Sequence, residues 1–318
     1  MSEPTTLPAS GATPTTDLLD GLNAPQREAV SHGEGPLLIL AGPGSGKTRV
    51  ITKRIVWLVR ECGVRPWEIL AITFTNKAAG EMRDRVLAML PVRGLWISTF
   101  HSMCARILRS EIEVLNVSGS GGAGYTRNFT IYDTSDRNEL LKKLIKAANY
   151  DVTQFKPSVV GAWISAGKNK GYAERPEAPI LAEGEDGMEH EVLVRVRRLY
   201  EEAMRKCNAL DFDDLLIRVL EIFDKHPGVR DAYASRFRHV LVDEYQDTNR
   251  VQYLLARHLS SFHRNLAVCG DPDRIPRRGD RAGQGDRAGA RTHRPGEPDR
   301  SPRSAVLHDR SRDGARLR

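Results

Sequence analysis

A glycine-rich loop between an apolar run and a helical pattern constrains the fold of this 318-residue chain more than any other feature. The loop comprises Ala41, Gly42, Pro43, Gly44, Ser45, Gly46, Lys47 and Thr48. Glycines let the backbone curl so that its N–H groups point toward phosphate oxygens at a helix N-terminus. Lys47 would reach the β- and γ-phosphates of a nucleotide, and the Thr48 hydroxyl would bind Mg²⁺. The loop, together with the adjacent Arg49, is therefore predicted to bind a nucleoside triphosphate.

Five apolar runs are continuous rather than alternating, which is typical of strands buried on both faces. They are residues 36–40, 69–74, 95–98, 239–242 and 265–268. Helical patterns, such as residues 48–60, lie between the first three runs. The alternation of strand and helix predicts an α/β fold with a doubly wound parallel sheet.

Two carboxylates end the fourth apolar run and complete the predicted site. Asp243 and Glu244 follow Val240-Leu241-Val242 directly. Asp243 is suited to hold Mg²⁺, directly or through water, and Glu244 to orient and deprotonate an attacking water molecule. An acidic pair at a strand end is by itself more often a helix cap or a solvated edge, but the glycine-rich loop favours the catalytic interpretation.

Residues 113–206 have a different character and are predicted to form a mainly helical insertion. Helical patterns cover residues 137–148 and 191–207. A glycine-rich stretch at residues 118–122 and a polar stretch at residues 168–189 interrupt them, and both are predicted as loops. The insertion divides a single α/β domain into two sequence segments.

Those two segments are residues 20–112 and 207–273. Residues 1–19 precede them and are rich in Pro, Thr and Ser. Such a composition offers almost nothing to bury, so a disordered leader is predicted there.

Several segments resemble, in order, the motifs of superfamily-one DNA helicases of the UvrD/PcrA/Rep group. Residues 243–249, Asp-Glu-Tyr-Gln-Asp-Thr-Asn, resemble motif II of that group. Further similar segments are the Q motif at residues 22–30, motif Ia at 72–82, motif Ib at 98–102 and a family segment at 210–216. The resemblance runs from residue 22 to residue 273.

The resemblance implies a RecA-like P-loop fold in the domain called 1A, with the helical insertion as domain 1B. It implies ATP and Mg²⁺ as cofactors and ATP-driven unwinding of DNA in the 3′→5′ direction. Gln26 would hydrogen-bond the adenine edge. The catalytic set would be Lys47, Asp243, Glu244 and Gln246, with Thr48 and Asp243 as metal ligands.

Contacts with single-stranded DNA are expected where two apolar runs end, because ligands bind at the carboxyl edge of such sheets. Single-strand binders combine aromatic stacking platforms with polar and basic groups. The residues expected in these contacts are Thr73, Phe74, Asn76, Thr99, Phe100 and His101. The alternative is that Phe74 and Phe100 are core residues and that His101 caps a helix.

The chain departs from the family pattern after Asp273, inside the segment that would be motif III. Residues 274–318 contain 13 arginines and six acidic residues, which account for the whole net charge of +7. Their apolar content cannot support a core, so we predict a disordered tail. A polybasic arm that grips nucleic acid is one interpretation. We favour a frameshift near residue 274, because the break falls within a motif.

The composition also narrows the class of protein. Four cysteines without a CxxC pair indicate neither a zinc site nor a disulfide framework. No apolar run reaches the ~18 residues of a membrane helix, so the expected setting is the cytoplasm, away from membranes. The Asn-Lys-x-Asp pattern of a GTPase is absent, since Ala79 follows Asn76-Lys77-Ala78. A signature helix of a transport ATPase is not found either.

Two functional alternatives stay open from the sequence. The family's ATP site lies between two RecA-like domains, and the second supplies arginines that can be worth ~10³–10⁵ in rate. We therefore expect a truncated chain that binds ATP and DNA without unwinding, and a noncatalytic fragment is the first alternative. The front part of a RecB/AddA-type helicase-nuclease is the second. The cellular role, whether DNA repair, replication restart or recombination control, is not determined by these motifs.

Overall fold

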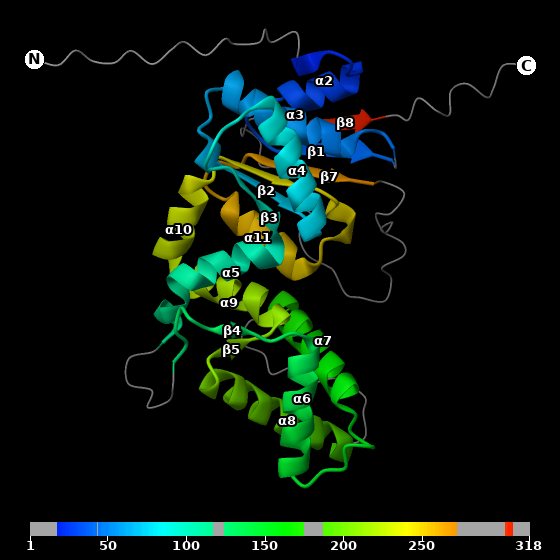
Figure 1. Cartoon of the computed structure of the whole chain (residues 1–318), viewed down its shortest axis with the longest axis vertical. Coiled ribbons are helices and arrows are strands. Elements are labelled where there is room, and N and C mark those ends of the chain that lie inside the picture. The colour runs from blue at the N-terminus through cyan, green and yellow to red at the C-terminus, as the bar shows by residue number, and fades with distance from the viewer. Residues whose placement is uncertain (1–17, 43, 117–123, 175–186, 272–302, 308–318) are drawn as a thin grey trace, which may run out of the picture.

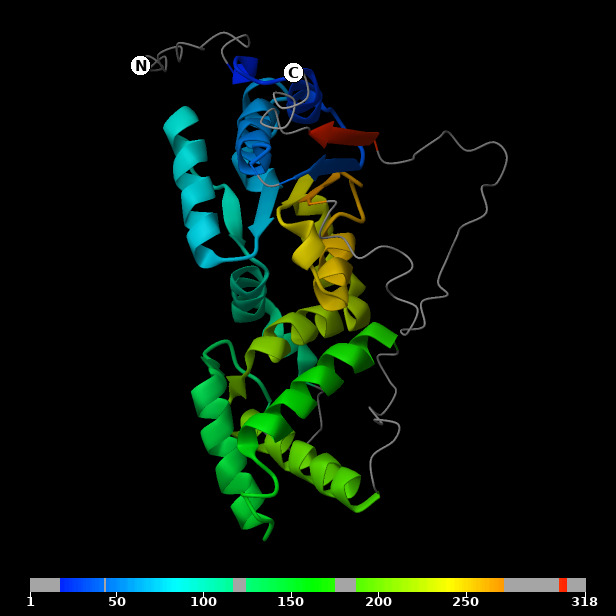
Figure 2. The same ribbon diagram turned by 90° about the vertical axis from the view of Figure 1, so that its right-hand side faces the viewer.

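The computed structural model describes residues 18–42, 44–116, 124–174, 187–271 and 303–307. Its upper part contains a parallel sheet with helices on both faces, and its lower part is helical (Figures 1 and 2). The chain passes from the sheet into the helical part and returns to the sheet. The fold is therefore of the RecA-like α/β class, as predicted.

The main sheet has six strands in the order β3-β2-β6-β7-β1-β8, and every neighbouring pair is parallel. The strands are β1 (Leu37–Ala41), β2 (Ile69–Thr73), β3 (Trp96–Thr99), β6 (His239–Val242), β7 (Leu266–Gly270) and β8 (Arg303–Leu307). The first five coincide with the predicted apolar runs, with ends that differ by no more than two residues. Two short parallel strands, β4 (Thr130–Ile131) and β5 (Ala209–Leu210), form a second sheet.

Two hydrophobic cores explain why the strand sequences are continuously apolar. Leu70 and Ile72 of β2 point into one core, whereas Ile69 and Ala71 point into the other. Because successive side chains of a strand point to opposite faces, a strand covered on both faces needs apolar residues at every position. The helices of residues 24–31, 47–60 and 76–89 cover one face, and the helices of residues 100–111, 212–225 and 250–259 cover the other.

Along the described residues, helices alternate with the first three strands, whereas the helices of residues 134–147, 157–174 and 187–206 follow one another without a strand between them. They are α2 (Ala24–Ser31), α3 (Lys47–Arg60), α4 (Asn76–Met89), α5 (Phe100–Glu111), α6 (Thr134–Ala147), α7 (Pro157–Glu174), α8 (Gly187–Lys206), α9 (Phe212–Lys225), α10 (Pro227–Arg236) and α11 (Arg250–Leu259). Short 3₁₀ turns are η1 (Pro66–Glu68), η2 (Ile112–Leu115) and η3 (Tyr245–Asp247). Within the part of the chain that the structure describes, no helix combines the length and apolar character needed to cross a bilayer.

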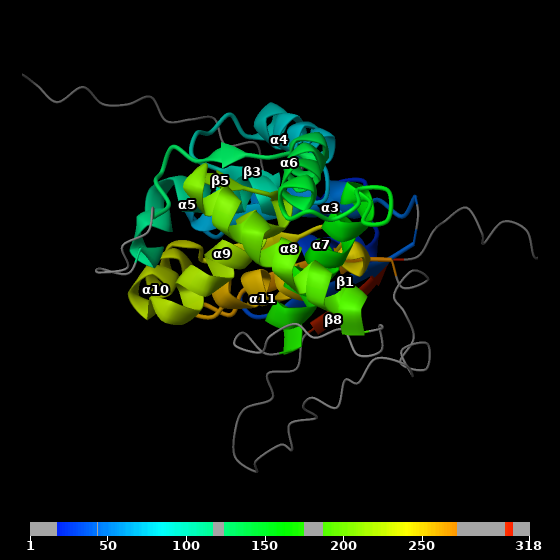
Figure 3. The same ribbon diagram turned by 90° about the horizontal axis from the view of Figure 1, so that it is seen from below.

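Helices α6, α7 and α8 lie together at the lower end of the molecule (Figures 1 and 3). They pack around a third core, which includes Leu141, Ile164 and Tyr200. The strand pair β4–β5 lies where the chain enters and leaves this helical part, because Thr130 pairs with Ala209. These helices therefore have a core separate from the two cores of the main sheet.

The prediction of a polar loop at residues 168–189 is wrong at both of its ends. Helix α7 continues to Glu174, and α8 begins at Gly187, so only residues 175–186 lie outside the described parts. The polar residues misled the prediction because Lys168 is buried and its charge is neutralised inside the protein. The predicted glycine-rich loop at residues 118–122 lies outside the described residues.

The predictions of disorder at the two termini need correction. Leu18 and Leu19 are helical, and Leu18 is buried against the core beneath α3. Residues 303–307 of the predicted disordered tail form β8, which pairs with β1. The prediction considered only side-chain composition, whereas an unpaired strand edge offers backbone N–H and C=O groups to any extended segment. Residues 1–17, 272–302 and 308–318 lie outside the described residues.

Candidate functional site

The predicted site residues follow strands whose carboxyl ends all lie at one edge of the sheet. The glycine-rich loop follows β1, Asp243 and Glu244 follow β6, and Asp271 follows β7. The predicted DNA contacts at residues 73–76 and 99–101 follow β2 and β3. Parallel pairing therefore brings segments from distant parts of the sequence to the same edge.

The glycine-rich loop has the backbone curvature that its sequence predicts. Gly44 and Gly46 have φ angles of 77° and 87°, which residues with a Cβ rarely adopt. Gly46 is the N-cap of α3, and Lys47 and Thr48 are its first residues. The Lys47 ammonium donates a hydrogen bond to the Ala41 carbonyl at 3.0 Å, and the Ser45 hydroxyl donates to the Gly42 carbonyl at 2.6 Å. Pro43 lies outside the described residues.

Asp243 is a buried carboxylic acid at the end of β6. Burial raises its pKa to about 6, and the charge of Glu244 adds to this shift. The Glu244 backbone N–H, which donates to Asp243 Oδ1 at 2.9 Å, and the Lys47 ammonium both lower the pKa. The influence of Lys47 shows that the loop and the acidic strand end lie within electrostatic reach of each other.

Cys269 on β7 provides a second indication that these charges converge. Burial raises the pKa of its thiol well above the usual range. The charges of Asp243 and Glu244 raise that pKa further, and the Lys47 ammonium lowers it. Since β7 lies between β1 and β6, the charges that follow both neighbouring strands influence this thiol of the intervening strand.

Gln246 holds Glu244 in place. Its side-chain Nε2 donates to Glu244 Oε2, and its Oε1 accepts a hydrogen bond of 3.0 Å from the Asp271 backbone N–H. Glu244 itself has a φ of 50°, an uncommon conformation for a residue with a side chain. Such backbone strain persists where the surrounding structure fixes it, and it is common at functional sites. The geometry supports a positioning role for Gln246.

Gln26 and Arg49 lie on the other side of the glycine-rich loop. Gln26 Nε2 donates to the Ser45 carbonyl at 2.9 Å, and its Oε1 accepts from the Asn23 backbone N–H. The Arg49 guanidinium lies 3.5 Å from the Asp20 carbonyl oxygen. Gln26, which was predicted to hydrogen-bond the adenine edge, thus has both ends of its side-chain amide bonded to backbone groups of the protein.

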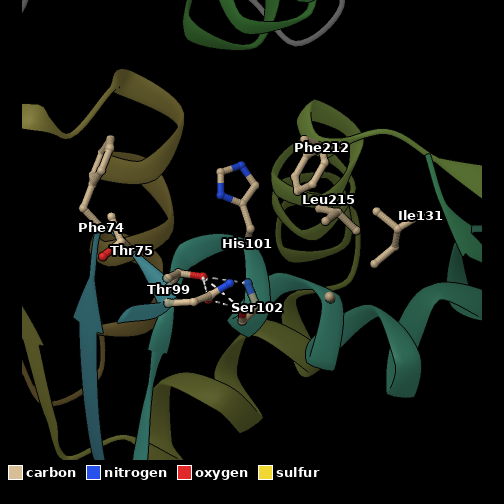
Figure 4. Close-up of a pocket in the computed structure, with 10 residues that line it drawn as sticks. Phe74, Thr75, Thr99, His101, Ser102, Ile131, Phe212 and Leu215 are labelled. Carbon is tan, nitrogen blue, oxygen red and sulfur yellow. Dashed lines mark hydrogen bonds between the residues drawn. The ribbon is translucent and has the colours of Figure 1, made fainter. Parts of the chain in front are cut away.

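A pocket of 330 Å³ opens beside the ends of β2 and β3 (Figure 4). It is lined by Phe74, Thr75, Asn76, Thr99, His101, Ser102, Ala105, Ile131, Phe212 and Leu215. In Figure 4, Phe74 lies on one side of the pocket and Phe212 on the other, with His101 between them. The pocket thus brings together the two segments in which DNA contacts were predicted.

Hydrogen bonds fix the polar floor of the pocket. The Ser102 hydroxyl donates to Asn76 Oδ1 at 3.2 Å, and the Thr99 hydroxyl bonds to Ser102 Oγ at 3.0 Å. Thr99 also caps α5 as its N-cap residue. Thr73 is buried, and its hydroxyl donates to the Thr75 carbonyl. Thr99 therefore lines the pocket as part of its hydrogen-bonded floor, whereas buried Thr73 does not line it, so the predicted DNA contact at Thr73 is wrong.

Two aromatic side chains of the pocket are about half exposed. Phe74 is 52% exposed and Phe212 is 49% exposed, although both are large apolar side chains. The rings of His101 and Phe212 meet edge to face with centroids 5.6 Å apart. Burial lowers the pKa of His101, and the charge of Asp213 partly opposes that shift. A neutral His101 ring beside two exposed phenyl rings suits an apolar or aromatic ligand.

The predicted contact at Phe100 is wrong. Its side chain is 4% exposed and belongs to the core with Leu70 and Trp96. The alternative interpretation of a core residue therefore holds for Phe100, whereas Phe74 is exposed at the pocket. Adjacent residues at the start of a helix point in different directions, so His101 faces the pocket when Phe100 faces the core.

Phe212, Ser102 and Leu215 line the pocket but were not predicted as site residues. Phe212 had a detectable signal, because it follows the helix N-cap Asp211 and lies outside the apolar face of α9. Because Phe212 is an aromatic residue at a helix start, inside the family segment of residues 210–216, it could have been predicted as a DNA contact like Phe74. Nothing local in the sequence identifies Ser102 or Leu215.

The fold and the site define an α/β protein of the RecA-like class with a glycine-rich loop, an acidic strand end and an adjacent aromatic pocket. Within that class, the chain belongs to the UvrD/REP helicase family, whose N-terminal domain matches residues 22–275. The match covers the same segment in which the sequence resembled that group.

Individual relatives agree with the family assignment. The ATP-dependent DNA helicase PcrA of Bacillus subtilis (strain 168) is 44% identical over 261 residues, which are 81% of this chain and 34% of that protein. The ATP-dependent DNA helicase UvrD1 of Mycobacterium tuberculosis (strain ATCC 25618 / H37Rv) is 43% identical over 272 residues, 83% of this chain and 34% of that protein. The chain spans about a third of the length of the curated relatives it matches.

Two alanine substitutions test the different placements of the adjacent pocket and core phenylalanines. Phe100→Ala is expected to lower the free energy of unfolding by about 3–5 kcal/mol, because it empties a buried site. Phe74→Ala is expected to change it by less than about 1 kcal/mol, since its ring is already half exposed. Urea unfolding of both variants measures the difference, and equal losses would contradict the placement.

Asp243→Asn is expected to stabilise the chain at pH 8 by up to about 3 kcal/mol, in the absence of nucleotide and divalent metal. The folded chain raises the pKa of Asp243 from 3.8 to about 6, so ionised Asp243 destabilises the fold above pH 6. The penalty shrinks as pH falls from 6 to 3.8 and vanishes below 3.8, where the carboxyl is protonated in both states. Thermal unfolding at pH 8 and pH 4 tests this, and a gain that is larger at pH 4 would contradict it.

Proposed function

We propose that this chain binds Mg·ATP at the glycine-rich loop and single-stranded DNA in the adjacent pocket, as the ATP-binding part of a 3′→5′ DNA helicase. The observation that carries the proposal is the position of three charged residues relative to the carboxyl edge of the parallel sheet. Lys47 comes directly after the loop that follows β1, and Asp243 and Glu244 follow β6, with one strand, β7, between β1 and β6. Membership of the UvrD/REP family supports the same function.

The residues of the loop fit a nucleotide. The N-terminus of the 14-residue helix α3 presents backbone N–H groups, which favour phosphate. Lys47 would exchange its bond to the Ala41 carbonyl for bonds to phosphate oxygens. The loop residues 41–48, with Gln26 and Arg49 beside them, would surround the nucleotide.

The site fits a magnesium ion that is bound together with a nucleotide. Among the described residues, no group of three or more His, Cys, Asp or Glu side chains could hold a metal by itself. Mg²⁺ in phosphate-transfer sites is bound by one or two carboxylates together with substrate phosphates and water. Thr48 and Asp243 would supply the protein ligands. The ion would favour ionised Asp243 and neutralise charge on the phosphates.

Glu244 and Gln246 would activate water for ATP hydrolysis. Glu244 is suited to accept a proton from the attacking water, because it lies beside Asp243 and is held by Gln246. Gln246 is in turn bonded to the Asp271 backbone at the end of β7. A movement of β7 would therefore shift the Glu244 carboxylate through the Gln246 side chain, which bonds to both.

The pocket fits single-stranded nucleic acid. Exposed Phe74 and Phe212 offer two faces for stacking, and base–aromatic stacking contributes ~1–3 kcal/mol per base. Asn76 and His101 add polar groups between them. Because β2 is paired directly with β6, the pocket lies one strand away from the acidic strand end. Nucleotide and DNA would therefore act on neighbouring strands of one rigid sheet.

Unwinding requires more than nucleotide and DNA binding. The family's second RecA-like domain supplies arginines to the ATP site, an effect worth ~10³–10⁵ in rate. We propose that the 318-residue polypeptide, tested alone, binds both ligands and does not separate strands.

Lys47→Ala tests the proposed function. The substitution is expected to weaken Mg·ATP binding roughly tenfold or more, because bonds to charged groups contribute about 1.5–3 kcal/mol. Binding of a fluorescent ATP analogue measures this, with Lys143→Ala on exposed α6 as the control that keeps full affinity. Equal affinity of Lys47→Ala and the unchanged chain would contradict the proposal. Duplex unwinding above that of Lys47→Ala would contradict the proposed lack of unwinding.

A further inference from the structure

A buried group of charges joins the helical insertion to the pocket. Lys168 on α7 is 8% exposed, and its ammonium lies 2.7 Å from Asp211 Oδ2 and 2.8 Å from Asp214 Oδ1. The Tyr200 hydroxyl on α8 donates to the same Asp211 oxygen at 2.9 Å. Two helices of the insertion thus hold two carboxylates at the start of α9.

The positive charge of Lys168 offsets the repulsion between these two buried carboxylates. Burial lowers the pKa of Lys168, but the charges of Asp214 and Asp211 more than compensate, so the net shift is upward. The pKa of Asp211 falls despite burial because Lys168 and Tyr200 donate to it, whereas burial raises the pKa of Asp214. Without Lys168, two carboxyl groups would face each other in a nearly water-free space, which is strongly unfavourable.

The two carboxylates cap the first turn of α9. Asp211 is the N-cap residue, and its Oδ1 accepts the Asp214 backbone N–H at 2.8 Å. The Asp214 carboxylate reaches back to the Asp211 backbone N–H at 3.3 Å. Asn169, next to Lys168 on α7, donates to Asp213 Oδ1 at 2.9 Å. Every polar side chain of this turn is therefore held by the turn itself or by the insertion.

The same turn carries one wall of the pocket. Phe212 and Leu215 both line it, and the Phe212 ring meets the edge of the His101 ring (Figure 4). The opposite wall, with Phe74 and Asn76, belongs to the end of β2 and the start of α4. One wall is thus built on the sheet, and the other depends on contacts with α7 and α8.

We propose that Lys168 is a positioning residue, which fixes the first turn of α9 and thereby aims Phe212 across the pocket at a nucleic-acid base. Asn169 and Tyr200 support the same turn. This inference rests on the proposed binding of single-stranded DNA in the pocket. Its consequence is that the placement of the insertion helices sets the affinity of the pocket, although Lys168 does not line it.

A double-mutant cycle tests whether Lys168 acts through Phe212. Binding of a fluorescent oligothymidylate to the full chain is expected to weaken roughly tenfold in Phe212→Ala, the order expected for one lost stacking contact. Lys168→Met is expected to weaken it by a similar factor, and Lys168→Arg is expected to recover part of the loss. In the Phe212→Ala background, Lys168→Met is expected to cause little further loss, because its effect passes through that ring.

Two further variants separate positioning from general destabilisation. Lys225→Met, which removes an exposed ion pair at the far end of α9, is expected to bind the oligonucleotide like the unchanged chain. Tyr200→Phe preserves packing and removes only the bond to Asp211, so a smaller loss of affinity is expected without unfolding. If Lys168→Met fails to fold, the Tyr200→Phe cycle with Phe212→Ala carries the test.

A measurement without DNA distinguishes failure of this inference from failure of the proposed function. Burial lowers the pKa of His101, and the charge of Asp213 partly opposes that shift. NMR can follow this pKa, and the His101 signal is assigned by its loss in His101→Gln. Loosening of Phe212 would hydrate the ring, so the pKa is expected to rise toward its usual value of 6.5 in Lys168→Met and Tyr200→Phe but not in Lys225→Met. No binding by the unchanged chain would refute the proposed DNA site alone. Additive effects in the cycle, or an unchanged His101 pKa, would overturn the positioning role.

Discussion

Parallel pairing of β2, β6, β7 and β1 is the constraint on which the rest of this structure depends. In a parallel sheet every strand ends at the same edge, so residues that follow different strands become neighbours regardless of their distance in the sequence. About 200 residues separate Lys47 from Asp243, yet the charge of one shifts the pKa of the other. The same edge carries the aromatic pocket after β2 and β3, which joins two candidate sites through one strand pairing.

Several groups at or beside this edge adopt states that are unfavourable for the folded chain. Asp243 is buried with a raised pKa, Glu244 adopts a left-handed backbone conformation, and Phe74 and Phe212 expose large apolar rings. Each feature costs stability, and the cores on both faces of the sheet offset that cost. Unfavourable groups gathered at one edge are expected where a ligand completes the site. A metal ion would favour the ionised form of Asp243, and a stacked base would cover an exposed ring.

The sequence predicted the features that depend on local pattern and missed those that depend on partners. Continuous apolar runs identified the strands, and the glycine-rich loop has the backbone it was expected to have. Lys168 was assigned to a loop because its partners lie over 40 residues away, where no local pattern reveals them. Phe100 and His101 look alike as site candidates until the helix direction separates them. β8 depends on an unpaired edge of β1, which only the assembled sheet presents.

We propose that Lys47, Thr48 and Asp243 bind one metal–nucleotide complex. Crystals of the chain grown with Mn²⁺ and a non-hydrolysable ATP analogue would test this proposal, because anomalous scattering locates the metal. We expect a single strong peak within bonding distance of the Thr48 hydroxyl, of the phosphates, and of the Asp243 carboxylate or a water molecule bound to it. The Lys47 ammonium is expected to contact the same phosphates. A metal and nucleotide bound away from these three side chains would contradict it.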